Sequence, residues 1–330
     1  MTSQSTLNHI LACLLFALCT LPSSTVGCPF AARSPSDDSD ALPFPGEQND
    51  VLTESAIRAS EPEYPLTWDT TYCRKKCLSK KVWKIVKAHN GKEVPNLVRA
   101  IFHDHQACAL DGSLRFEMDR RENKPLKDTS SKVVAAAYSC GCSIADTYTL
   151  GAKFALRFAG GPRVKMSWGH KDATKANPRG NLPRGRSDAD TLRKVMYQYN
   201  DEAIALLSSA HNLGHGHRRL RNKTFKKVPF TTNPQYFNNE YFKNLVHLYK
   251  YGKAPKGTFQ LRSDRALIED DKFLYIVKAY AENDKLYYYH FKLVMELMIS
   301  DFTECNYGDK DDEKPLSKSY EPVSKPYYRR

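Results

Sequence analysis

Two side chains with complementary chemistry, Arg99 and His103, stand four residues apart. Residues at positions i and i+4 lie on the same face of a helix, so we expect these two side by side. Arginine is a permanent cation with rigidly placed donors, and histidine can take up and return a proton near neutral pH. The pair could therefore move a proton and stabilise a developing negative charge. The alternative is a surface arginine beside a hydrogen-bonded histidine with no catalytic role.

A second histidine, His211, ends the apolar stretch 203–210 just before Gly214. In a dry pocket its imidazole could bind a metal, and Asp264 in the segment 261–267 could accept the other ring proton, as carboxylates do beside metal-bound histidines. The alternatives are a histidine that stabilises a helix C-terminus and an aspartate that caps a helix. The residues alone leave both interpretations open.

In this order, these segments resemble the plant, fungal and bacterial haem peroxidase superfamily. Further matching segments are 111–117, 160–162, 185–189, 232–243 and 264–281, the last of which is most similar to ascorbate peroxidases. The resemblance extends roughly from Tyr72 to Asp301. Several motifs in a fixed order are far more specific than any one of them.

The resemblance implies an all-α fold, the haem peroxidase fold of about ten helices, with haem b held between a distal and a proximal half. On the distal side it makes His103 the acid–base catalyst and Arg99 its cationic partner. It also gives Asn123 the role of orienting His103. On the proximal side His211 is the iron ligand, and Asp264 accepts its other ring proton. The implied activity is reduction of hydrogen peroxide with one-electron oxidation of a donor.

Three positions depart from the ascorbate peroxidase pattern. That pattern has tryptophan beside the distal histidine and near the proximal one, where this sequence has Phe102 and Phe230. It also has a basic residue that contacts ascorbate, where this sequence has Leu220 between Arg219 and Arg221. The expected donor is therefore a small reducing molecule, a phenol or ascorbate, with phenols oxidised at least as well as ascorbate.

Two loops resemble cation sites of the secreted peroxidase branches. Asp104, Asp111 and Ser113 are candidate calcium ligands, because they resemble the distal calcium site and calcium prefers oxygen ligands. The segment 231–238 resembles a proximal cation loop, but Asn212 and Asn238 replace its hydroxyl and acidic ligands. At that second loop we expect no ion.

Helical periodicity dominates the segment that must position these side chains. Pro95 suits the first position of a helix and precedes apolar residues spaced along one face. Asn200 can cap the helix at 203–211, whose first turn is acidic. Further helices are predicted at 133–138, 143–158, 272–281 and 285–299. Because strand signals are few and short, the fold class is mostly α.

The two ends of the chain have a different composition. Residues 10–21 form an apolar run too short to span a bilayer comfortably, and small residues follow it, which is typical of a signal peptide. A buried N-terminal helix is the alternative. We expect a signal peptide at 1–27, a flexible leader at 28–65, a peroxidase domain at 66–305 and a disordered tail at 306–330. The distal half would extend to about residue 190, and the protein would be secreted and extracellular.

Cysteine usage agrees with export. Removal of the predicted signal leaves seven cysteines, Cys28, Cys73, Cys77, Cys108, Cys140, Cys142 and Cys305. In an oxidising compartment they are expected to form disulfides, and because seven is odd, one stays free or pairs with another chain. The spacing does not decide which cysteines pair.

The net charge of +13 favours anionic partners such as an acidic extracellular matrix, although a merely soluble, well-charged surface is an equal alternative. No nucleic-acid-binding motif and no later run long enough to span a membrane is present. The competing functional hypothesis is a basic extracellular matrix protein or a haem-binding protein with little peroxidase activity. The intact set of Arg99, His103, His211 and Asp264 argues against a purely structural role.

Overall fold

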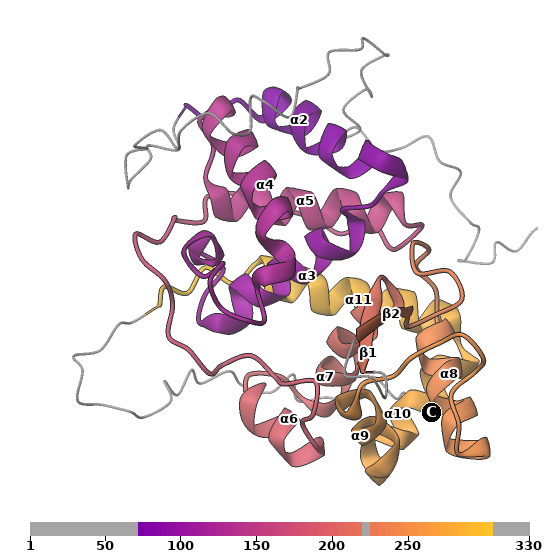
Figure 1. Cartoon of the computed structure of the whole chain (residues 1–330). Coiled ribbons are helices and arrows are strands. Elements are labelled where there is room, and N and C mark those ends of the chain that lie inside the picture. Colours follow the sequence, from indigo (N-terminus) through magenta and orange to yellow (C-terminus); the bar gives the residue numbers. More distant parts are fainter. Residues whose placement is uncertain (1–71, 220–224, 306–330) are drawn as a thin grey trace, which may run out of the picture. The chain divides into compact units, whose positions relative to one another are not determined.

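The structure is a computed structural model that describes residues 72–219 and 225–305 (Figure 1). Within this part the chain forms ten α-helices and one two-stranded antiparallel sheet, so the predicted all-α class is confirmed. None of these helices combines the length and the apolar character needed to cross a membrane. The predicted signal peptide, leader and tail lie outside the described residues, so the domain boundaries stay predictions.

The first group of helices carries the distal residues. It comprises α2 (Lys75–Lys87), α3 (Val94–Ala107), α4 (Lys127–Cys140) and α5 (Ile144–Phe158), with short 3-10 turns η3 (Ala88–Asn90), η4 (Ser113–Phe116) and η5 (Lys124–Leu126). Helix α5 packs against the other three, with its first turn capped by Ser143, which accepts a hydrogen bond from the backbone of Asp146. Pro95 lies in the first turn of α3, as predicted.

The second group carries the proximal residues. It comprises α6 (Ala189–Val195), α7 (Asp201–Ser208), η6 (Ser209–Asn212), α8 (Glu240–Tyr251), α9 (Arg262–Glu269) and α10 (Asp271–Glu282). Strands β1 (His215–Arg219) and β2 (Phe225–Pro229) form a hairpin after η6, with His215 opposite Pro229. Asn200 caps α7 by accepting a hydrogen bond from Ala203, so that predicted cap is confirmed. Helix α10 packs against α7, α8 and α9.

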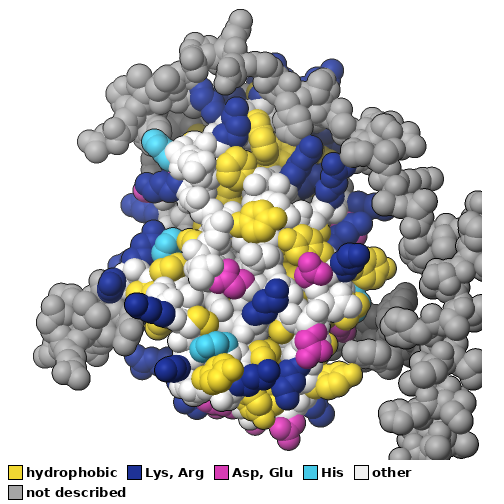
Figure 2. Space-filling view, turned by 90° about the vertical axis from the view of Figure 1, so that its right-hand side faces the viewer, with side chains coloured by type: hydrophobic (Ala, Val, Ile, Leu, Met, Phe, Trp, Pro, Cys, Tyr) yellow, Lys and Arg dark blue, Asp and Glu magenta, His cyan; other side chains and the backbone are white. Residues whose placement is uncertain are grey.

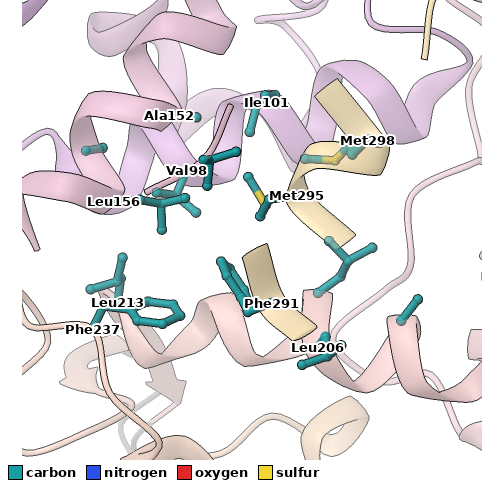
Figure 3. Close-up of a cluster of buried hydrophobic side chains, with 14 of the residues drawn as sticks. Val98, Ile101, Ala152, Leu156, Leu206, Leu213, Phe237, Phe291, Met295 and Met298 are labelled. Atoms are coloured by element: carbon teal, nitrogen blue, oxygen red, sulfur yellow. The ribbon is translucent and has the colours of Figure 1, made fainter. Parts of the chain in front are cut away.

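Helix α11 (Asp284–Ile299) completes one continuous core between the two groups. Figure 3 shows Phe291 and Met295 of this helix between Val98 of α3 on one side and Leu206 of α7 on the other. All four side chains are at most 3% exposed. Because the same core contains side chains from both groups, it fixes the helix that carries His103 relative to the turn that carries His211.

Three disulfides connect six of the seven cysteines that follow the predicted signal peptide. The pairs are Cys73–Cys142, Cys77–Cys140 and Cys108–Cys305. The first two tie the start of α2 to the end of α4, and the third ties the end of α3 to the last described residue. The expectation of disulfides is therefore confirmed, while Cys28 lies outside the described residues.

Candidate active site

On the distal side, helix α3 places Arg99 and His103 one turn apart on the same face. The Arg99 Nε donates a hydrogen bond to His103 Nε2 at 3.1 Å. The second arm of the guanidinium is held by the backbone carbonyl of Glu122, which accepts from Arg99 Nη2 at 2.7 Å. The structure thus brings the predicted pair together and fixes the cation from two directions.

Asn123 forms a hydrogen bond with the other ring nitrogen of His103, Nδ1. Its Oδ1 lies 2.7 Å from His103 Nδ1, and its Nδ2 donates to the backbone and side-chain oxygens of Glu117 at 3.3 and 3.4 Å. Because Glu117 can only accept here, the amide oxygen of Asn123 must face the imidazole. The proton of neutral His103 therefore lies on Nδ1, and Nε2 stays unprotonated, with its lone pair accepting the hydrogen bond from Arg99. Asn123 and Glu117 are both fully buried.

The electrostatics of His103 keep it neutral. Burial is the main cause that lowers its pKa to about 3, and the positive charge of Arg99 lowers it further, while the bond to Asn123 acts in the opposite direction. A neutral imidazole with an unprotonated Nε2 is the form that can accept a proton.

On the proximal side, a single buried carboxylate receives three hydrogen bonds. Asp264 Oδ1 accepts from His211 Nδ1 at 2.8 Å and from the Tyr241 hydroxyl at 2.9 Å. Asp264 Oδ2 accepts from the backbone N–H of Leu261 at 2.7 Å, which also closes the first turn of α9. The carboxylate side chain is only 1% exposed, so these donors replace the water that it would otherwise bind.

An aromatic ring lies next to each of the two histidines, His211 and His103. The Phe230 ring stacks on the imidazole of His211, with centroids 4.7 Å apart and planes 16° apart. The Phe102 ring lies 6.2 Å from the ring of His103. Burial and the carboxylate of Asp264 raise the pKa of Tyr241 well above its ordinary value, so its hydroxyl stays protonated and remains a donor.

These residues fit a haem. Asp264 occupies only the Nδ1 of His211, and within the described residues no hydrogen bond engages its Nε2. The His211 side chain is 37% exposed, although the apolar residues just before it on α7 are buried. A neutral imidazole whose other ring proton is held by a carboxylate is the usual proximal ligand of haem iron in peroxidases. His211 is therefore the residue that would hold the iron of a bound haem.

The comparison with known families decides the identity. The family model described as peroxidase matches residues 78–283. The chain belongs to the haem peroxidase family. Among curated relatives, the peroxisomal L-ascorbate peroxidase 5 of Arabidopsis thaliana is 32% identical over 207 residues, which make up 59% of this chain and 71% of the relative. The cytosolic L-ascorbate peroxidase 1 of Oryza sativa subsp. indica is 34% identical over 153 residues, 46% of this chain and 58% of the relative.

A third relative, the cytosolic L-ascorbate peroxidase 2 of Arabidopsis thaliana, is 33% identical over 148 residues, 44% of this chain and 56% of the relative. This peroxidase therefore spans little more than half the length of two of these three relatives. The all-α structure and the family match together give it the haem peroxidase fold, and its similarity is to ascorbate peroxidases.

The candidate calcium residues of this peroxidase lie together but already have protein partners. The oxygens of Asp104 accept backbone hydrogen bonds from Asp111, Gly112 and Leu114 at 2.8 to 3.0 Å. Asp111 accepts from the backbone of Ser113 at 3.0 Å. Burial and the neighbouring Asp111 raise the pKa of Asp104 well above its ordinary range. In the described part of the chain, no three His, Cys, Asp or Glu side chains are grouped to hold a metal ion, so calcium stays a prediction.

A reciprocal pair of hydrogen bonds holds Asn212, the residue that follows His211. Asn212 Nδ2 donates to Asn238 Oδ1 at 3.0 Å, and the backbone N–H of Asn238 donates to Asn212 Oδ1 at 3.0 Å. The Thr231 hydroxyl donates to the backbone oxygen of Asn212 at 2.8 Å. Neutral side chains thus fasten the loop at the place where the sequence resembled a cation site. Leu220, the position that bears on ascorbate, lies outside the described residues.

Three groups that hold the site were given no role from the sequence: the backbone carbonyl of Glu122, the carboxylate of Glu117 and the hydroxyl of Tyr241. Glu117 and Tyr241 both lie in segments that carried the family resemblance, which was the available signal. Their partners, however, depend on contacts between separate elements.

The low pKa of His103 predicts a reaction with peroxide that hardly changes with pH. The second-order rate of the haem-loaded protein should vary by less than about twofold between pH 5 and pH 8, because a pKa of about 3 keeps Nε2 unprotonated over this range. Stopped-flow absorbance at constant ionic strength measures this rate. A fall of about tenfold or more between pH 7 and pH 5 would place the pKa at about 6 or above and contradict the assignment.

Proposed function

We propose that this chain is a secreted peroxidase that reduces hydrogen peroxide at a haem held by His211 and oxidises small phenolic donors. One observation carries the proposal. His103 is held between Asn123 and Arg99 as a neutral base, while His211 is held by Asp264 with its second nitrogen available. A distal base and a proximal ligand, each fixed by a hydrogen bond at Nδ1, are what peroxide cleavage at a haem requires.

The distal residues perform the proton transfer. A peroxide oxygen next to His103 gives its proton to Nε2, and Nε2 then passes that proton to the other oxygen, which leaves as water. Arg99 stabilises the negative charge that develops while the oxygen–oxygen bond breaks. Asn123 retains the proton on Nδ1, so Nε2 starts each turnover as a base. Two donor molecules each give up one electron and one proton, so one peroxide yields two waters and two oxidised donors.

The proximal residues set how strongly His211 would donate electrons to the haem iron. Bound haem supplies the iron that takes peroxide and stores its two oxidising equivalents. Asp264 draws on the Nδ1 proton of His211, which increases the electron donation of the imidazole through Nε2. The bond from Tyr241 to the same oxygen keeps the carboxylate in place. We propose haem b in particular, because all six described cysteines are in disulfides and none is available for covalent attachment.

Replacement of His103 by Leu tests the proposed reaction. It should slow the reaction with hydrogen peroxide by about 10²- to 10⁴-fold, because it removes the positioned acid–base group. The haem content should not change, since His103 is not the ligand. Stopped-flow absorbance of the haem-loaded protein measures the rate, and His217→Leu on the exposed face of β1 is the control. A loss smaller than about tenfold would mean that His103 is not the catalyst.

Secretion is supported by the disulfides and by the apolar N-terminal segment. Disulfides persist in oxidising compartments, whereas the relatives compared above are named as peroxisomal or cytosolic proteins. We expect N-terminal sequencing of protein collected from the medium to start near Cys28, and thiol titration to find the six paired cysteines oxidised. An uncleaved chain with reduced cysteines would contradict export.

The donor is the point on which the chain and its relatives differ. Ascorbate is the second candidate, because the relatives compared above are named ascorbate peroxidases. Phenols are favoured because Leu220 stands in place of a basic residue, and the loss of one charge-assisted contact costs about 1.5–3 kcal/mol. Phe102 and Phe230 in place of tryptophan point the same way, since electrons would then enter at the haem edge.

Steady-state turnover with guaiacol and with ascorbate, at matched peroxide concentrations, decides between these donors. We expect guaiacol to be used at least as well as ascorbate. The Leu220→Arg variant, measured under the same conditions, should oxidise ascorbate faster and guaiacol at an unchanged rate, because only ascorbate is anionic. If the unaltered protein prefers ascorbate by more than about tenfold, which corresponds to 1.4 kcal/mol in the transition state, the argument from Leu220 is wrong.

A further inference from the structure

Helix α2 carries a row of lysines that the proposed peroxidase chemistry does not use. Its thirteen residues include six lysines and no acidic residue. Four of the lysines follow each other at helical spacing and are all exposed: Lys76, Lys80, Lys84 and Lys87. We call these four the α2 lysine row. The buried residues of the same helix, Leu78, Val82 and Val86, lie on its opposite face, so the row faces solvent directly.

This row weakens the helix that carries it. Like charges at i and i+4, as in Lys76–Lys80 and Lys80–Lys84, destabilise a helix. Lysines in the first turn oppose the helix dipole, and here no acidic residue offsets them. None of the four ammonium groups has an ion-pair partner among the described residues. Charges that reduce local stability without an internal partner are typical of functional surfaces.

The surroundings hold the row in place despite that repulsion. The disulfides Cys73–Cys142 and Cys77–Cys140 fasten the beginning of α2 to the end of α4. Further along the helix, the Trp83 ring packs edge-on against Phe154 and Phe158 of α5, with centroids 5.6 and 6.1 Å apart. The lysines therefore stand on a rigid support, and binding to them requires no folding of the helix.

We propose that the α2 lysine row is a binding site for a linear acidic polysaccharide. The row extends over eleven residue steps, which at the rise of an α-helix is about 16 Å. A straight row of cations suits a chain whose sulfate or carboxylate groups repeat along its length, and a compact anion could engage only one or two of them. On the face drawn in Figure 2, Lys and Arg side chains outnumber Asp and Glu, which favours the approach of such a polyanion.

Two features favour a polysaccharide over the other polyanions. A helix that binds a membrane surface inserts an exposed apolar face, whereas the apolar face of α2 is buried in the protein. Two disulfides at the start of α2 belong to an oxidising compartment, where nucleic acid is not the usual polyanion. This inference rests on the secretion proposed above, but it does not depend on the peroxidase reaction.

The test uses the full chain, loaded with haem, and two variants with the same change in charge. In the first, Lys76, Lys80, Lys84 and Lys87 are replaced by Gln, which keeps the helix propensity of the segment. In the control, four exposed lysines at or just after α8 are replaced by Gln: Lys243, Lys250, Lys253 and Lys256. Calorimetry measures binding to heparin, which is sulfated, and to polygalacturonate, which is carboxylated. The acidic residues before Tyr72 are present in all three proteins, so their effect is constant.

We expect the α2 variant to bind at least one of the two polysaccharides at least about tenfold more weakly, because exposed ion pairs that sum to 1.4 kcal/mol give that factor. The control should lose less than about threefold, and both variants should keep the helical circular dichroism and the peroxide turnover of the parent. The polysaccharide that shows the larger loss identifies sulfate or carboxylate as the recognised group.

Three results would overturn the proposal. Equal losses in both variants would show that net charge alone, rather than the row, attracts the polymer. Unchanged binding in the α2 variant would show that the site lies elsewhere. Tighter binding of vesicles rich in phosphatidylserine, or of duplex DNA, that also depends on the row would assign it to another class of partner. Failure of peroxide turnover in the parent would contradict the proposed function and leave this comparison valid.

Discussion

The hydrogen bond from His211 to Asp264 is the contact on which the proximal half of this peroxidase depends. An isolated buried carboxylate is costly, and the fold meets this cost with three donors from three elements: η6, α8 and the start of α9. Loss of any one donor would leave an oxygen poorly paired and free the other elements to shift. The carboxylate therefore both sets the direction of the imidazole and locks the packing of the helices around it.

In the distal half, an amide oxygen binds the histidine Nδ1 where the proximal half uses a carboxylate. Asn123 holds Nδ1 of His103, and its own orientation is fixed by Glu117, which is paired with Arg120 at 2.6 Å. In both halves a protein acceptor occupies Nδ1 and leaves Nε2 for chemistry. The two acceptors differ in charge, and the chemical properties of the two histidines differ accordingly. In the proposed reaction, neutral Asn123 would leave His103 as a weak base, whereas the carboxylate of Asp264 would make His211 a stronger electron donor.

Much of the fold follows from local patterns in the sequence. The helix at Pro95, the cap at Asn200 and the long helix α11 follow from turn chemistry and apolar spacing, which act over a few residues. Helix α2 was not predicted, although Leu78, Val82 and Val86 have helical spacing, because the lysines between them obscure that pattern. The disulfide pairs join residues 63 to 197 positions apart, so only the folded chain brings them together.

Some residues of the site could be placed from the sequence, and others only from the folded structure. The pairing of Arg99 with His103 follows from their spacing on one helix, and Asn123 was placed by family resemblance alone. The neighbouring Glu122 contributes its backbone carbonyl, which accepts a hydrogen bond from Arg99. Tyr241 could not be assigned a role, since its bond to Asp264 joins helices that meet only in the folded protein.

Haem binding to a His211→Ala variant tests the central claim most directly. Titration of ferric haem into the parent protein, followed by absorption spectroscopy, should give one tightly bound, five-coordinate haem per chain. The variant should lose this spectrum, and added imidazole should restore it by taking the place of the missing ring. His215→Ala, at an exposed position four residues further on, should behave like the parent. An unchanged spectrum and affinity in His211→Ala would show that another residue holds the iron and would contradict the account.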